Sequence, residues 1–174
     1  LTLADVNPST LKYALLAGVF MIVIYHLSFW LGVNPQIDLG HLLVDLLLLG
    51  LFTFFAEKDY KTYKNDGILH FWQGMTIGFI VYSIGAVIFL SGQIFYYNFD
   101  GDAVINYQFA ATKFLEERSE IFIEKFGDEI YQLQLEEIKQ VTKWDLIQES
   151  TVKKIIAGFF ITPVISIILR KQPN

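Results

Sequence analysis

The sequence contains no cysteine and few charged residues for its length. Only 18% of its 174 residues are Asp, Glu, Lys or Arg, whereas a soluble domain carries about 25%. The absence of cysteine excludes a disulfide framework, a thiolate metal site and a cysteine nucleophile. The net charge of −5 argues against nucleic acid as a partner. Hydrophobic residues instead make up 53% of the chain, and most of them lie in long runs.

The lengths of these runs predict helices that cross a membrane. The run from Tyr13 to Leu31 has no charge other than one on His26, and as a helix it would cover about 30 Å, the thickness of the hydrocarbon core. Three further runs follow. We therefore expect an all-α, polytopic membrane helical bundle in a single domain, 1–174, with four transmembrane helices at about 12–32, 38–56, 69–97 and 151–170.

The segment between the third and fourth runs, about 98–150, has a different composition. Residues 103–149 hold ten acidic and five basic side chains, while apolar residues recur at helical spacing. Gly127 and Asp128 can end one helix and begin another. We expect an extramembrane helical hairpin that is amphipathic rather than membrane-spanning.

The distribution of Lys and Arg in the short loops predicts the orientation. Lys58, Lys61 and Lys64 follow the second run, and Arg170 with Lys171 follows the fourth. This favours the cell inner membrane with both termini cytoplasmic and the 98–150 segment periplasmic. Lys153 and Lys154, at the start of the fourth run, favour the opposite orientation. We expect both side chains to extend outward from the fourth span.

Small residues predict where helices pack closely in lipid, because they let two backbones approach. They recur at spacings of four or seven residues on the first and third runs. The simplest interpretation is packing within the bundle, and the alternative is contact with another subunit. The candidate packing residues are Ala14, Gly18, Gly74, Gly78, Gly85 and Gly92.

A cluster of polar residues is expected in the outer half of the bundle. Asp38, His41 and Asp45 are three and four residues apart, which places them on one helical face. Folding the first span back on the second brings His26 level with them, and residues near the outer end of the third span reach a similar depth. The full candidate cluster is His26, Asp38, His41, Asp45, Ser91 and Gln93.

Placing an ionisable side chain inside a membrane span costs free energy, so such a residue is a candidate functional residue. Three interpretations remain open. The cluster can join helices, with Asp45 paired to His26; it can line a polar cavity for a headgroup, a substrate or a proton relay; or two histidines and a carboxylate can hold a metal. No HExxH, P-loop, GxGxxG or GxSxG motif occurs, so we assign no catalytic residue, no metal and no cofactor, and an enzyme is disfavoured.

The apolar stripe of the 98–150 segment is too long for a two-helix hairpin to bury. Its acidic surface would be repelled by anionic headgroups, so a protein should cover the remainder. We expect another membrane protein subunit or a second copy of the chain to dock on Phe122, Phe126 and Trp144.

Three segments carry a resemblance to a known family: YALLAGVFMIVIY in the first run, FWQGMTIGF at the start of the third, and GFFITPVISIILRK at the end. Together they resemble an uncharacterised family, a domain of unknown function, of small four-span inner-membrane proteins from Bacteroidota. The resemblance implies a link to envelope glycan or lipid metabolism and no established activity.

These observations favour a non-catalytic accessory or assembly subunit of a larger inner-membrane complex, in contact with membrane lipids. The alternative is a small transporter or lipid-handling protein that uses the intramembrane polar cluster. Small size and the absence of a catalytic motif favour the first, whereas the polar cluster favours the second.

Overall fold

The computed structural model describes residues 8–172, and the described chain folds into seven helices. No strand occurs within this range, where the one extended contact is an isolated bridge between Leu69 and Lys171. The helices are α1 (Pro8–Trp30), α2 (Gly40–Tyr63), α3 (Phe71–Phe99), α4 (Ala103–Glu116), α5 (Ser119–Phe126), α6 (Asp128–Gln140) and α7 (Lys143–Leu169).

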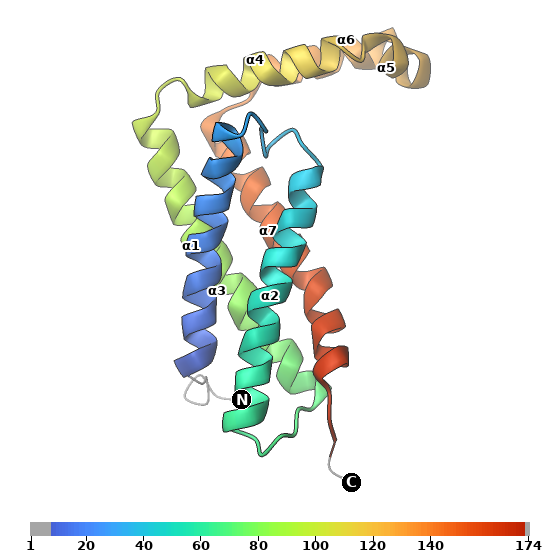
Figure 1. Ribbon diagram of the computed structural model, residues 1–174. Coiled ribbons are helices and arrows are strands. Elements are labelled where there is room, and N and C mark those ends of the chain that lie inside the picture. The colour runs from blue at the N-terminus through green and yellow to red at the C-terminus, as the bar shows by residue number, and fades with distance from the viewer. Residues whose placement is uncertain (1–7, 173–174) are drawn as a thin grey trace.

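Four of the helices, α1, α2, α3 and α7, are long and apolar enough to cross a membrane. They run side by side as a bundle, and α1 begins at the same end of the bundle where α7 ends (Figure 1). Helix α3 packs against α1 and α7, and α2 packs against the same two neighbours. Because α2 and α7 both run from the α4–α6 end to the opposite end, they are parallel partners. The expected all-α bundle with four long apolar helices is confirmed.

The glycines of α3 permit close contact with two different neighbours. A β-carbon added at Gly74 would lie 2.6 Å from the Ser166 hydroxyl, and one at Gly78 would collide with Thr162, so both positions face α7. Gly85 and Gly92 instead face α1, against Met21 and Ile22.

Helix α1 meets α3 through its own small residues. Gly18 packs on Ile88 of α3, and Ala14 is fully buried. All six candidate packing residues therefore lie buried or in close contact between helices of this chain.

Helix α7 is longer than the final hydrophobic run. It begins at Lys143, and Thr142 caps it by accepting a hydrogen bond from the Asp145 amide while Asp145 accepts one from the Thr142 amide. Such a capping box fixes a helix start. The 27 residues of α7 measure about 40 Å. The last span therefore continues as one helix beyond the apolar run that predicted it.

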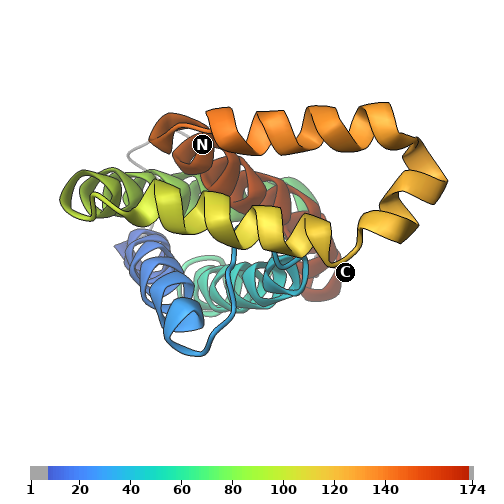
Figure 2. The ribbon, with the colours of Figure 1, turned by 90° about the horizontal axis from the view of Figure 1, so that it is seen from above.

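The segment between α3 and α7 forms an arm across one end of the bundle. Seen from above, α4 and α6 run side by side in opposite directions and α5 joins them beyond the edge of the bundle (Figure 2). The hairpin expected from the sequence is present, with the short helix α5 as its turn. Gly127, between α5 and α6, has φ of 87°, a conformation that glycine adopts readily.

Candidate functional site

A buried ion pair joins α2 to α7. The Lys154 ammonium donates to both carboxylate oxygens of Asp45, at 2.6 Å each. Lys154 is 2% exposed and Asp45 is 3% exposed. A buried ion pair is stable only when its geometry is good and other groups stabilise the charges. The groups around Asp45 and Lys154 therefore determine whether the pair stabilises the fold.

The identity of this partner corrects two sequence expectations. Asp45 does not pair with His26, whose Nδ1 lies 2.8 Å from the Ile22 carbonyl oxygen of its own helix. Lys154 does not extend outward, because its position on α7 faces α2. Its neighbour Lys153 is partly exposed, and it binds Glu149 at 2.6 Å and the Gln36 carbonyl oxygen at 3.0 Å.

Two aromatic rings enclose the Lys154 ammonium. Nζ lies 4.8 Å from the centre of the Phe89 ring and 5.4 Å from the centre of the Tyr25 ring. Both side chains are almost completely buried. Cation–π attraction is strongest where water is excluded. The rings therefore replace part of the hydration that Lys154 loses.

His41 lies one helical turn from Asp45 and is the least satisfied member of the group. Its Nε2 is 3.7 Å from the nearer carboxylate oxygen of Asp45, which is too far for a hydrogen bond, and it has no hydrogen-bond partner within residues 8–172. Its Nδ1 lies 3.4 Å from the Ser28 hydroxyl. A cavity of about 40 Å³ borders His41, Asp45, Lys154 and Asp38, and this is room for a water molecule or two.

The remaining candidates of the predicted polar cluster are dispersed. Asp38 borders the same cavity and accepts a hydrogen bond from the Gly40 amide. Ser91 is exposed and donates to Val87 of its own helix. Gln93 is fully buried, and neither of its amide atoms has a partner among the described residues. The structure therefore groups Asp38, His41 and Asp45 around one cavity, which His26, Ser91 and Gln93 do not border.

A second polar contact between α2 and α7 was not anticipated. The Ser166 hydroxyl donates to Glu57 at 2.8 Å, and Glu57 is completely buried. The two contacts pair residues with the same sequence separation, 109, as parallel helices in register require. Twelve residues separate them along each helix, or about 18 Å. We call Asp45–Lys154, the pair nearer the arm, the outer clamp, and Glu57–Ser166, the pair farther from the arm, the inner clamp (Figure 1).

Only part of this arrangement was detectable in the sequence. On α7, Ser150, Lys154, Gly158, Thr162 and Ser166 recur every four residues, which predicts one polar or small face. That period could have identified Lys154 as inward-facing. Nothing in the sequence gives the register of α7 against α2. No set of three or more His, Asp or Glu side chains is placed to hold a metal ion in the part of the chain that the structure describes.

The three candidate docking residues do not form one surface. Phe122 is half-buried against Phe126 and Tyr131 at the α5–α6 turn. Trp144 belongs to the first turn of α7, at the opposite end of α6. Since α6 has 13 residues, about 20 Å of helix separates the two places. Phe126 and Trp144 are exposed, so each could make a contact of its own.

The described helices define a class of protein: a multi-pass helical membrane protein with an amphipathic arm at one end of the bundle. The chain belongs to the family described as "Protein of unknown function (DUF4199)", whose model matches residues 12–171. The expectation of an uncharacterised family is thereby confirmed. Neither the curated proteins nor the solved structures contain a match to this chain.

Proposed function

We propose that this protein is a non-catalytic accessory or assembly subunit of a larger inner-membrane complex. The observation that carries the proposal is a set of exposed apolar side chains on α5 and the first half of α6. Phe126 is 59% exposed and Leu133 is 48% exposed, and Ile121 and Ile130 are exposed beside them in sequence. We call these four residues the arm tip. Ile130 and Leu133, three residues apart, share one face of α6, and exposed apolar patches mark interaction sites.

The charge of the arm supports a protein partner rather than the bilayer surface. Helices α5 and α6 contain six acidic side chains and two basic ones. Anionic headgroups repel such a surface, whereas helices that bind membranes carry Lys and Arg. A partner with a neutral or basic face around an apolar centre fits the arm tip best.

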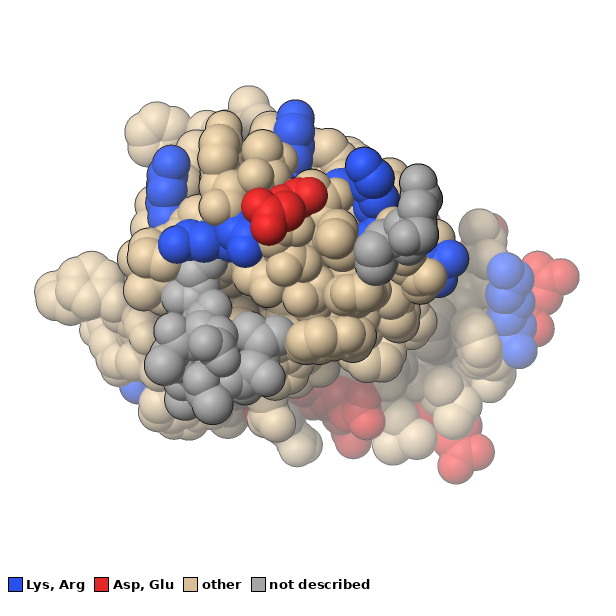
Figure 3. All heavy atoms as spheres, turned by 90° about the horizontal axis from the view of Figure 1, so that it is seen from below, with Lys and Arg blue, Asp and Glu red and all other residues tan. Residues whose placement is uncertain are grey.

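The basic end of the bundle supports an orientation with the arm in the periplasm. Lysine and arginine side chains spread over the end opposite the arm (Figure 3). They include Lys58, Lys61 and Lys64 near the end of α2 and Arg170 and Lys171 after α7. By the positive-inside rule this end is cytoplasmic. A role in envelope glycan or lipid metabolism and an origin in Bacteroidota belong to the same proposal, on the strength of the family resemblance.

Affinity purification from native membranes tests the proposal. Phe126→Ser removes an apolar contact from the arm tip, and Ile105→Ser is the matched control, because Ile105 is equally exposed on α4. We expect a specific protein to co-purify with the wild type and the control and to decrease at least tenfold with Phe126→Ser. Equal recovery with both variants would contradict docking at the arm tip.

A second candidate function is proton transfer in the outer clamp, within a small transporter or lipid-handling protein. It is favoured by the unpartnered Nε2 of His41 beside a water-sized cavity and a buried ion pair. Histidine gains and loses protons near neutral pH. Vesicles containing the purified chain should then dissipate an imposed pH gradient, and His41→Leu should abolish this activity. Equal rates in protein-containing and empty vesicles would exclude it.

A further inference from the structure

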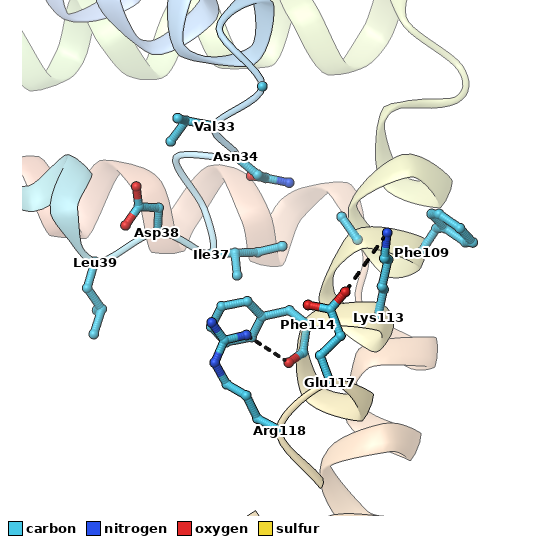
Figure 4. A pocket seen from close by; sticks show the side chains of 12 residues that line it. Val33, Asn34, Ile37, Asp38, Leu39, Phe109, Lys113, Phe114, Glu117 and Arg118 are labelled. Atoms are coloured by element: carbon cyan, nitrogen blue, oxygen red, sulfur yellow. Dashed lines mark hydrogen bonds and ion pairs between the residues drawn. The ribbon is translucent and has the colours of Figure 1, made fainter.

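A groove lies where the arm meets the turn between α1 and α2. It has a volume of about 1040 Å³ and is lined on one side by residues 32–39 and on the other by the second half of α4 and the two residues that follow it. In Figure 4, Ile37 of the turn and Phe114, Glu117 and Arg118 on the other side point into the space between them, whereas the Asp38 and Phe109 side chains point away from it. Because α1 ends at Trp30 and α2 begins at Gly40, the groove lies level with the ends of the spans, where lipid headgroups are found.

The apolar part of the lining continues onto the lipid-facing side of the bundle. Val33, Ile37 and Leu39 come from the turn, and Phe109 and Phe114 come from α4. Leu39 is 81% exposed, and Leu43, one turn further along α2, is also exposed. An acyl chain that enters the groove can therefore pass from Leu39 along α2 without crossing a polar surface.

The charged part of the lining contains two acidic and two basic side chains. Asp38 lies on the turn side, and Lys113, Glu117 and Arg118 lie on the α4 side (Figure 4). The Arg118 guanidinium is held 3.8 Å above the Phe114 ring and donates to the Phe114 carbonyl oxygen. The Lys113 and Glu117 side chains are 4.0 Å apart and exposed, so a ligand can replace that contact at little cost.

We propose that this groove binds one molecule of a zwitterionic phospholipid with a primary ammonium headgroup, phosphatidylethanolamine, taken from the surrounding bilayer. The phosphate lies against Arg118 and Lys113, because arginine recognises phosphate through paired hydrogen bonds. The ammonium donates to the carboxylate of Glu117. The acyl chains lie on the apolar wall and leave along Leu39.

The balance of charges distinguishes this headgroup from its competitors. Phosphatidylglycerol supplies the phosphate but has no cation for Glu117. Phosphatidylcholine has a cation without an N–H group, so it donates no hydrogen bond to a carboxylate. The arm tip contributes nothing to the groove, so the proposal is independent of any protein partner.

Native mass spectrometry of the chain 1–174 in mild detergent tests the proposal. The three lipids, with identical acyl chains, are added at equal concentration. We expect phosphatidylethanolamine to be retained about tenfold more than the other two, and Arg118→Gln to lower its retention about tenfold. The matched control is Lys125→Gln, which removes a cation from α5 outside the groove and should change nothing.

A second variant separates headgroup selection from general phospholipid binding. Glu117→Gln keeps the side-chain length but removes the negative charge that receives the ammonium. It should lower the retention of phosphatidylethanolamine and raise that of phosphatidylglycerol. Equal retention of all three lipids by the wild type, or unchanged retention by Arg118→Gln with normal elution on gel filtration, would mean annular lipid only and overturn the proposal.

Discussion

Removing the cation of the outer clamp should destabilise the bundle strongly. Lys154→Met keeps most of the side-chain length and leaves the Asp45 carboxylate buried without its partner. The loss of one member of a buried pair costs about 3–5 kcal/mol. Both N–O distances are 2.6 Å and both residues are almost completely buried, so the cost should be near the upper part of this range. Proteins are stable by about 5–15 kcal/mol, so the loss is a large fraction of the total.

The adjacent lysine offers a matched control. Lys153 pairs with Glu149, but the two side chains are 33% and 48% exposed. Such a surface pair contributes about 0–1 kcal/mol. Lys153→Met should therefore lower the free energy of unfolding far less than Lys154→Met, although the two changes remove the same charge from adjacent positions.

Replacing both members of the outer clamp should restore stability. Two buried hydrophobic residues of similar volume can match or exceed a buried ion pair, so Asp45→Leu with Lys154→Met should recover most of the loss. Equilibrium unfolding in mixed detergent micelles, followed by circular dichroism, measures all four proteins. The reasoning is refuted if Lys154→Met costs no more than Lys153→Met, or if the double variant is as unstable as Lys154→Met.

Three further changes probe the inner clamp, the α3–α7 contact and the topology. Glu57→Leu should cost about 1–3 kcal/mol by leaving a buried hydroxyl without its acceptor, and Glu57→Gln should cost less; thermal unfolding compares them. Gly78→Ala should lower the melting temperature because its β-carbon collides with Thr162, and Thr162→Ala should restore part of the loss. Single cysteines at Lys64 and Asp128, in a chain without native cysteine, should react with an impermeant reagent from opposite sides of the membrane.

Each of these outcomes has a specific control or contradiction. Gly101→Ala has no atom within 4 Å of the added β-carbon and should leave the melting temperature unchanged. Equal losses for Glu57→Leu and Glu57→Gln would show that the hydrogen bond from Ser166 contributes little. Labelling of both single cysteines from the same side would mean that α3 does not cross the membrane.

The number and type of the helices could be predicted because each depends on local sequence. A run of about twenty apolar residues has few stable structures other than a membrane-spanning helix. Helix ends were harder to predict: α7 begins at Lys143 because Thr142 and Asp145 cap it, upstream of the apolar run. The arm was predicted from the helical spacing of its apolar residues, and the break at Gly127 agrees with the end of α5.

Only the α2 side of the candidate site could be predicted from the sequence, and the α7 side could not. His41 and Asp45 share a face because both lie on α2, and spacing within a helix is fixed. The pairing of Asp45 with Lys154 depends on how far α7 is displaced along α2, which contacts between these two helices, such as Gly50 against Ile161, help to fix. Folding α1 back through its turn suggested His26 by depth alone, but depth says nothing about which way a side chain points.

Photo-crosslinking in living cells tests the accessory-subunit proposal most directly. A photoreactive amino acid is placed at Leu133, in the exposed arm tip, and in a second strain at Ile105, which is exposed on α4 outside it. The proposal predicts a discrete product at Leu133 that contains a second, different polypeptide, and no such product at Ile105. Crosslinks only between copies of this chain, or the same product from both positions, would contradict it.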